Sequence, residues 1–283
     1  MELLVAIPIA ASIVWSINPP IIYKFARNAP PLIFTSVRAV FALIFVGTFL
    51  ALNGINVRNV TPWIVLLVIA SGVLGPGIGD AAYTRSIQLL GGSLAVVISY
   101  TYIFFAQLFS ILMFNEKIRL VTAIGGVIAF TGIVVASLDN KLSAVNKRGL
   151  IYAFTASVCW GFATSLIKAV EEYFDVVSLA FWRLVSVALF TLMLSTLSRE
   201  KAHFSRDFVV ATALTGVLGW GIGMLLFVQA IYVLGVSVTV VATALTPVLS
   251  QLTSKLIAGE KASSRVLLGA LLVATGIGIQ ILS

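Results

Sequence analysis

Long apolar runs alternate with short polar connectors along the whole chain. A transmembrane helix needs about 20 mostly apolar residues, and ten runs of about that length can be recognised. They lie at 3–23, 31–52, 62–88, 93–114, 118–138, 149–168, 176–198, 207–232, 236–258 and 263–282. The pattern therefore predicts an all-α integral membrane protein with ten transmembrane helices.

The connectors have ordinary loop lengths and leave no room for an extramembrane domain. The first run is not read as a secretory signal peptide. Its only early charge is Glu2, no basic segment precedes it, and it is too long.

Composition supports the membrane assignment. The chain is 60% apolar and 10% charged, and its mean hydropathy is +1.11, whereas soluble domains are about 25% charged. The net charge of +8 arises from Lys and Arg scattered between apolar runs. That scatter makes no basic face for nucleic acid. A single cysteine, Cys159, excludes a disulfide scaffold.

The chain also repeats itself. Residues 71–136 shifted by 144 positions onto 215–280 match at roughly a third of positions, far more than composition explains. With one further residue of shift, Trp15 meets Trp160 and Arg38 meets Arg183. The two units, 1–140 and 147–283, would each hold five helices. An odd number inverts the second copy in the membrane, which is an architecture typical of secondary transporters.

These residues carry a family resemblance over the whole chain. Its elements are Trp160-Gly161 with Lys168; Trp15, Asn18 and Lys24; Arg38 and Arg183; and Thr246-Pro247 through Gly259-Glu260-Lys261 to Gly269. The chain resembles the EamA-like permeases of the ten-helix drug/metabolite transporter superfamily. It departs from them where Tyr102-Ile103 replaces Thr-Pro, and where Asp80 and Arg85 replace apolar or aromatic residues.

The resemblance implies a plasma-membrane transporter that exports small metabolites, such as amino acids or related amphipathic compounds and drugs. It further implies four-helix cores that move while the fifth and tenth spans pack at the periphery. We expect membrane lipid around a functional monomer, no cofactor and no nucleic-acid partner. Proton coupling, uniport and exchange all remain open.

Asp80 is the acidic residue that lies well inside a predicted span, roughly 12 Å from the nearer end at 1.5 Å per residue. A carboxylate at such depth costs at least about 2.5–3.5 kcal/mol, so it should face the bundle interior. One interpretation is a ligand for a substrate ammonium group or a proton-coupling site. The alternative is an internal ion pair with Arg85 or Arg38; Arg85 is about 140° away around the helix.

The remaining candidates divide into a cavity and structural or gating positions. Aromatic and polar residues near helix-breaking Pro19-Pro20 and Gly75-Pro76-Gly77 are expected to line a central cavity with Asp80. This set is Trp15, Asn18, Tyr83, Tyr100, Trp160, Trp220, Thr243 and Thr246. For Arg38 and Arg183 we favour a structural role, such as a bond to a backbone carbonyl, over anion binding. Glu116 and Glu260 suit helix-end caps, with gating as the alternative.

The sequence shows no motif for a dinucleotide, a metal ion or a catalytic triad. Gly75-x-Gly77-x-Gly79 follows no strand, so it is read as helix packing and not as a dinucleotide motif. His203 has no metal-ligand or triad partner nearby in the sequence. An enzyme or scaffold is therefore disfavoured. The main alternative is a flippase for a lipid or lipid-linked sugar on the same fold.

The two indications of orientation disagree. Ten basic residues lie on the face with the 1–2, 5–6, 7–8 and 9–10 connectors, and four lie on the opposite face. The positive-inside rule then places both termini outside the cytoplasm, whereas the family resemblance implies cytoplasmic termini. We follow the count and predict that an epitope tag after Ser283 is labelled by antibody in intact cells. Labelling only after permeabilisation would favour the opposite orientation.

Overall fold

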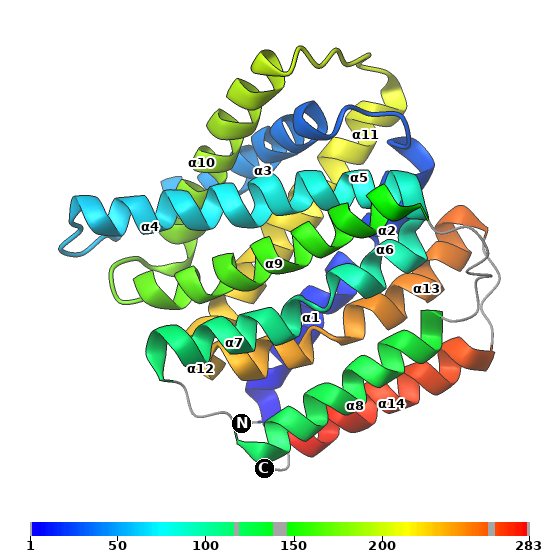
Figure 1. Cartoon of the computed structure of the whole chain (residues 1–283). Coiled ribbons are helices and arrows are strands. Elements are labelled where there is room, and N and C mark those ends of the chain that lie inside the picture. The colour runs from blue at the N-terminus through cyan, green and yellow to red at the C-terminus, as the bar shows by residue number, and fades with distance from the viewer. Residues whose placement is uncertain (1, 116–118, 138–145, 260–263, 282–283) are drawn as a thin grey trace.

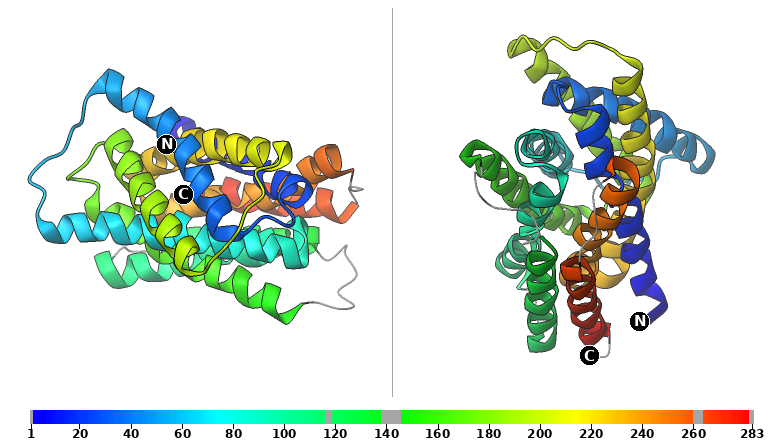
Figure 2. Two further views of the ribbon diagram at one scale, coloured as in Figure 1. Left: turned by 90° about the horizontal axis from the view of Figure 1, so that it is seen from above. Right: turned by 90° about the vertical axis from the view of Figure 1, so that its right-hand side faces the viewer.

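The computed structural model describes residues 2–115, 119–137, 146–259 and 264–281, and the regular elements within these ranges are helices. Figures 1 and 2 show one bundle of helices that cross one another at a range of angles. In chain order they are α1 (Glu2–Trp15), α2 (Asn18–Phe25), α3 (Pro31–Asn53), α4 (Pro62–Gly72), η1 (Val73–Gly79), α5 (Asp80–Leu90), α6 (Gly92–Ser99), α7 (Tyr102–Phe114), α8 (Leu120–Ser137), α9 (Lys147–Val170), α10 (Val176–Leu197), α11 (Arg206–Leu214), η2 (Thr215–Gly223), α12 (Met224–Ala242), α13 (Leu245–Ala258) and α14 (Ser264–Ile281).

Seven continuous helical segments among the described residues are long and apolar enough to cross a membrane. They are Leu3–Phe25, Pro31–Leu52, Pro62–Leu90, Gly92–Phe114, Lys147–Val170, Val176–Leu197 and Arg206–Ala242. Large apolar side chains such as Leu52 and Leu256 are more than 75% exposed on the exterior, while Arg38, Asp80 and Arg183 are buried. An apolar exterior around a partly polar interior is the arrangement that lipid requires.

The helices lose their regular geometry at mid-length. Proline lacks a backbone N–H, and Pro19 and Pro20 lie in the first turn of α2, directly after the break that follows α1. Pro76 lies inside η1, which has π-helical geometry, as does η2. Further breaks separate α6 from α7 at Tyr100-Thr101 and α12 from α13 at Thr243-Ala244. These irregular segments free backbone groups in the middle of the bundle.

The longest helical segment contains a kink at Gly235. The sequence predicts a connector between 232 and 236, and the structure continues as helix from Arg206 to Ala242. Within it Gly235 has φ 77° and ψ 176°. This geometry, which glycine adopts without a Cβ penalty, recurs at Gly91 (φ 85°, ψ 159°) between α5 and α6. The expected turn is therefore a single-residue kink.

The same close contacts occur twice at the repeat spacing. A Cβ built on Gly72 would lie 2.5 Å from the backbone oxygen of Arg183, and one on Gly216 would lie 2.5 Å from that of Arg38. In addition, α8 and α14 lie side by side at one edge (Figure 1), where a Cβ on Gly132 would lie 2.6 Å from the oxygen of Gly269. These glycines allow backbones to approach directly, as in membrane helix pairs.

We predict that Gly72→Ala and Gly216→Ala each destabilise the protein. The added methyl group would overlap a backbone oxygen that cannot rotate away, and overpacking typically costs about 1–3 kcal/mol. Thermal unfolding in detergent should show a lower midpoint for both variants. Gly278→Ala is the matched control, because a Cβ at Gly278 meets nothing within 4 Å. A shift no larger than that of the control would contradict this packing.

Candidate functional site

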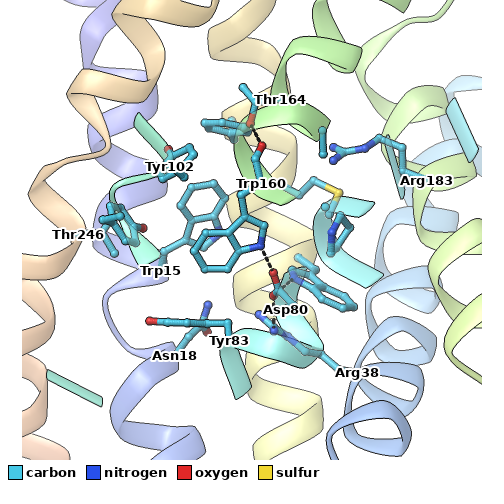
Figure 3. A pocket seen from close by; sticks show the side chains of 17 residues that line it. Trp15, Asn18, Arg38, Asp80, Tyr83, Tyr102, Trp160, Thr164, Arg183 and Thr246 are labelled. Atoms are coloured by element: carbon cyan, nitrogen blue, oxygen red, sulfur yellow. Dashed lines mark hydrogen bonds and ion pairs between the residues drawn. The ribbon is translucent and has the colours of Figure 1, made fainter. Parts of the chain in front are cut away.

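A cavity of about 110 Å³ lies where the irregular helical segments meet (Figure 3). About 10–15 Å³ of such space holds one water molecule, so the cavity has room for several waters or a small organic group. Eight of the nine residues predicted from the sequence line it: Trp15, Asn18, Asp80, Tyr83, Tyr100, Trp160, Trp220 and Thr246. Their helical segments come from both halves of the chain.

Five residues named from the sequence have other outcomes. Thr243 does not line the cavity; it is fully buried behind Tyr102, and the two hydroxyl oxygens are 2.5 Å apart. Glu116 and Glu260 lie outside the described residues. Arg38 and Arg183, which were expected to be structural or gating residues, both line the cavity.

The sequence prediction missed several lining residues. They include Gly75, Pro76, Tyr102, Ala163, Thr164, Met224 and Phe227. The repeat carried a usable signal for four of them: at the spacing of 144, Met224 corresponds to Asp80, Phe227 to Tyr83, Tyr102 to Thr246, and Pro76 to Trp220. Applying the repeat to each candidate residue would have found them.

Asp80 is held by three donors. Its Oδ1 accepts from Trp160 Nε1 at 2.7 Å, and its Oδ2 accepts from Arg38 Nη1 at 2.8 Å and from Trp220 Nε1 at 3.0 Å. The residues Asp80 and Arg38 are 8% and 3% exposed. Asp80 therefore forms the internal ion pair with Arg38 that the sequence left as an alternative. Arg85 is exposed and instead donates to Gln88.

Arg38 is satisfied on more than one side. Its Nε donates to the backbone oxygen of Thr215 in η2 at 3.1 Å, and its Cζ lies 4.2 Å from the ring centroid of Trp220. The first bond is made to the backbone carbonyl of the first residue of η2, and the second is a cation–π contact. The backbone-carbonyl role expected from the sequence is present, together with the ion pair.

Arg183 has a different environment. It projects from α10 into the cavity and is 4% exposed. Within the part of the chain that the structure describes, no ion pair involves Arg183, and its Nε has no hydrogen-bond partner. One of the two repeat-related guanidinium groups is thus neutralised by a carboxylate and the other is not.

Aromatic rings form most of the remaining wall. Trp160 packs edge-to-face against Tyr83, Tyr100 and Tyr102, with ring centroids 4.9, 6.3 and 6.0 Å away. Trp15 donates its indole N–H to the oxygen of Gly219 at 2.8 Å and packs on Phe227. Such a wall binds the apolar body of a small amphipathic molecule. No group of three potential metal ligands occurs among the described residues.

Comparisons with known proteins add a family, a relative and a fold. The model of the EamA-like transporter family matches residues 2–138 and again 147–282. A protein of Archaeoglobus fulgidus described as an uncharacterized transporter is 22% identical over 282 residues, spanning 100% of this chain and 98% of that protein. A crystal structure at 18% identity superposes with a TM-score of 0.80 over 100% of this chain and 97% of its own, which shows the same fold.

We predict a strong energetic coupling between Asp80 and Arg38. Removing either partner strands a buried charge and typically costs about 3–5 kcal/mol. The double variant Asp80→Asn/Arg38→Gln should therefore lose much less stability than the sum of the single variants, measured as a double-mutant cycle of thermal unfolding. Asp80→Asn combined with Arg85→Gln is the matched control and should be additive. Additivity in both cycles would refute a stabilising ion pair.

Proposed function

Because the chain belongs to the EamA-like transporter family, we propose that it is a ten-helix secondary transporter that moves small metabolites through its central cavity. The observation that most directly supports this proposal is a buried, partly polar cavity in the middle of a bundle with an apolar exterior. Such a site lies at the depth where inverted-repeat transporters bind their substrates. The cavity suits a small amphipathic solute better than a lipid-linked sugar.

The proposed architecture is two inverted five-helix repeats, 1–140 and 147–283. Two successive matches to one family model support a duplication. The recurring contacts support it further: Gly79 packs against Trp160 just as Gly223 packs against Trp15. The Gly235 kink divides the longest segment into two spans, of which the second continues through α13. With α8 and α14 added, the seven long segments then become ten spans.

Alternating access would break contacts between the halves at one end while those at the other end hold. At the end where α2 finishes, Lys24 Nζ donates to the oxygen of Ile257 at 2.7 Å. At the opposite end, the backbone N–H of Arg58 donates to the oxygen of Tyr173 at 2.9 Å. Both bonds join the first half to the second. We propose them as members of the two gates.

Three donors occupy the carboxylate oxygens of Asp80. Proton coupling through this residue would require those donors to withdraw during each cycle. We therefore favour exchange or uniport over proton coupling, with amino acids or related amphipathic compounds exported across the plasma membrane as the proposed physiological process.

The test is uptake into proteoliposomes from a mixture of small anionic, neutral and cationic metabolites, with retained compounds identified by mass spectrometry. We expect a defined subset to be enriched, and Trp160→Ala to reduce its uptake by about tenfold or more, since a central aromatic contact is lost. Trp63→Ala is the control, because Trp63 is 63% exposed at the start of α4. Enrichment of no soluble compound would refute transport of small metabolites.

A further inference from the structure

The charged side chains that line the cavity do not balance. They are Arg38, Asp80 and Arg183. Arg38 and Asp80 neutralise one another through the 2.8 Å ion pair, so the lining carries one net positive charge, which belongs to Arg183. A charge in such a position is costly within a membrane unless something compensates it.

Arg183 is placed to bind a ligand and not to reach the membrane surface. Its side chain is 96% buried, and its Nε is an unpartnered donor among the described residues. Figure 3 shows the guanidinium extending from α10 toward the cavity, on the side away from Asn18. The carbonyl oxygen of Arg183 lies directly against Gly72, so α10 packs closely on α4 at this position.

Among the described residues, Arg183 lacks the counter-ion that the repeat-related Arg38 has. Arg38 obtains its counter-ion from Asp80, and the residue 144 positions later is Met224, which also lines the cavity. Each guanidinium also lies against a repeat-related glycine: a Cβ on Gly75 would lie 3.3 Å from Arg183 Nη2, and one on Gly219 would lie 2.9 Å from Arg38 Nη2. Where the first half places the carboxylate of Asp80, the second half therefore places the neutral thioether of Met224.

We infer that Arg183 binds the carboxylate of the transported molecule, while the aromatic wall around Trp160 holds its apolar body. This inference rests on the proposed transport function and specifies its substrate class as small amphipathic carboxylates. The carboxylate supplies the negative charge that Asp80 supplies to Arg38. Asp80 is then an internal counter-ion and not a ligand for a substrate ammonium group.

Charge also selects among anions. One carboxylate neutralises the lining, whereas a phosphate dianion would leave it with a net negative charge in a low-dielectric site. The planar fork of arginine matches a carboxylate with two parallel hydrogen bonds. A zwitterion makes the same carboxylate bonds to Arg183 but leaves the lining with a net charge of +1. Its ammonium group has a hydrogen-bond acceptor in Asn18 Oδ1, which is buried and without a partner among the described residues.

The first experiment varies the ligand and leaves the protein unchanged. Matched carboxylates, carboxamides and amines on phenyl, indolyl and isobutyl skeletons, with the corresponding amino acids and inorganic phosphate, are tested for thermal stabilisation and for uptake into proteoliposomes. We expect carboxylates or amino acids to bind at least about tenfold more tightly than the carboxamides, and phosphate not to bind. Equal or stronger binding of amides or amines would overturn the inference.

The second experiment removes the charge of Arg183 or supplies it with an internal counter-ion. Arg183→Gln should reduce the preference for carboxylate over carboxamide to less than about threefold, since the charge-assisted bonds are lost. Arg85→Gln removes the same charge from an exposed position and should keep the preference. Met224→Asp would restore an internal counter-ion and should abolish carboxylate binding, while Met224→Leu should not. An unchanged preference in Arg183→Gln would overturn the inference.

The two proposals fail in different ways. Uptake of amines or neutral solutes, without carboxylates, would leave transport standing and remove Arg183 as the substrate ligand. No binding and no uptake by the wild-type protein for any compound would overturn both. Because the ligand series uses the wild-type protein, misfolding of a variant cannot decide the result.

Discussion

The buried ion pair between Asp80 and Arg38 is the interaction on which the centre of this molecule depends. It joins α5 to α3, and the two indole N–H groups of Trp160 and Trp220 connect it to α9 and η2. Four segments from both halves therefore converge on one carboxylate. In a low-dielectric interior such a group is tolerated only when its charge and lone pairs are all satisfied. That requirement fixes where Trp160 stands, and Trp160 in turn orders three tyrosines.

The two stretches that match the family model contribute different charges to the cavity: Arg38 and Asp80 come from residues 2–138, and Arg183 comes from residues 147–282. Glycines, tryptophans and arginines recur at corresponding places and make corresponding backbone contacts. Residues between them differ, and Met224 stands at the position that corresponds to Asp80. Among the described residues Arg183 has no ion-pair partner, so repeated packing surrounds one uncompensated charge.

The fold class and much of the cavity were predictable because both follow from hydropathy and repetition. Trp15 and Trp160 were matched by the repeat and expected in one cavity, and the proline and glycine segments indicated the helix breaks. Three-dimensional pairing was not predictable. Asp80 had two arginine candidates, and only the packing of α3 against α5 shows that Arg38 is its partner. Likewise, Thr243 was expected in the cavity, but it caps the end of α12 and its hydroxyl bonds to the hydroxyl of Tyr102, which lines the cavity in its place.

The unbalanced charge also bears on the transport cycle. An empty cavity would carry the charge of Arg183 through the conformational change, whereas a cavity holding a carboxylate would be neutral. Rearranging the halves around an uncompensated buried charge is the costlier step, since each partly formed gate would exclude the water that solvates it. The loaded protein should therefore change conformation more readily than the empty one. That difference favours exchange of one carboxylate for another over uniport. Such an exchange requires no residue to carry a proton, and Asp80 and Arg38 can stay paired throughout.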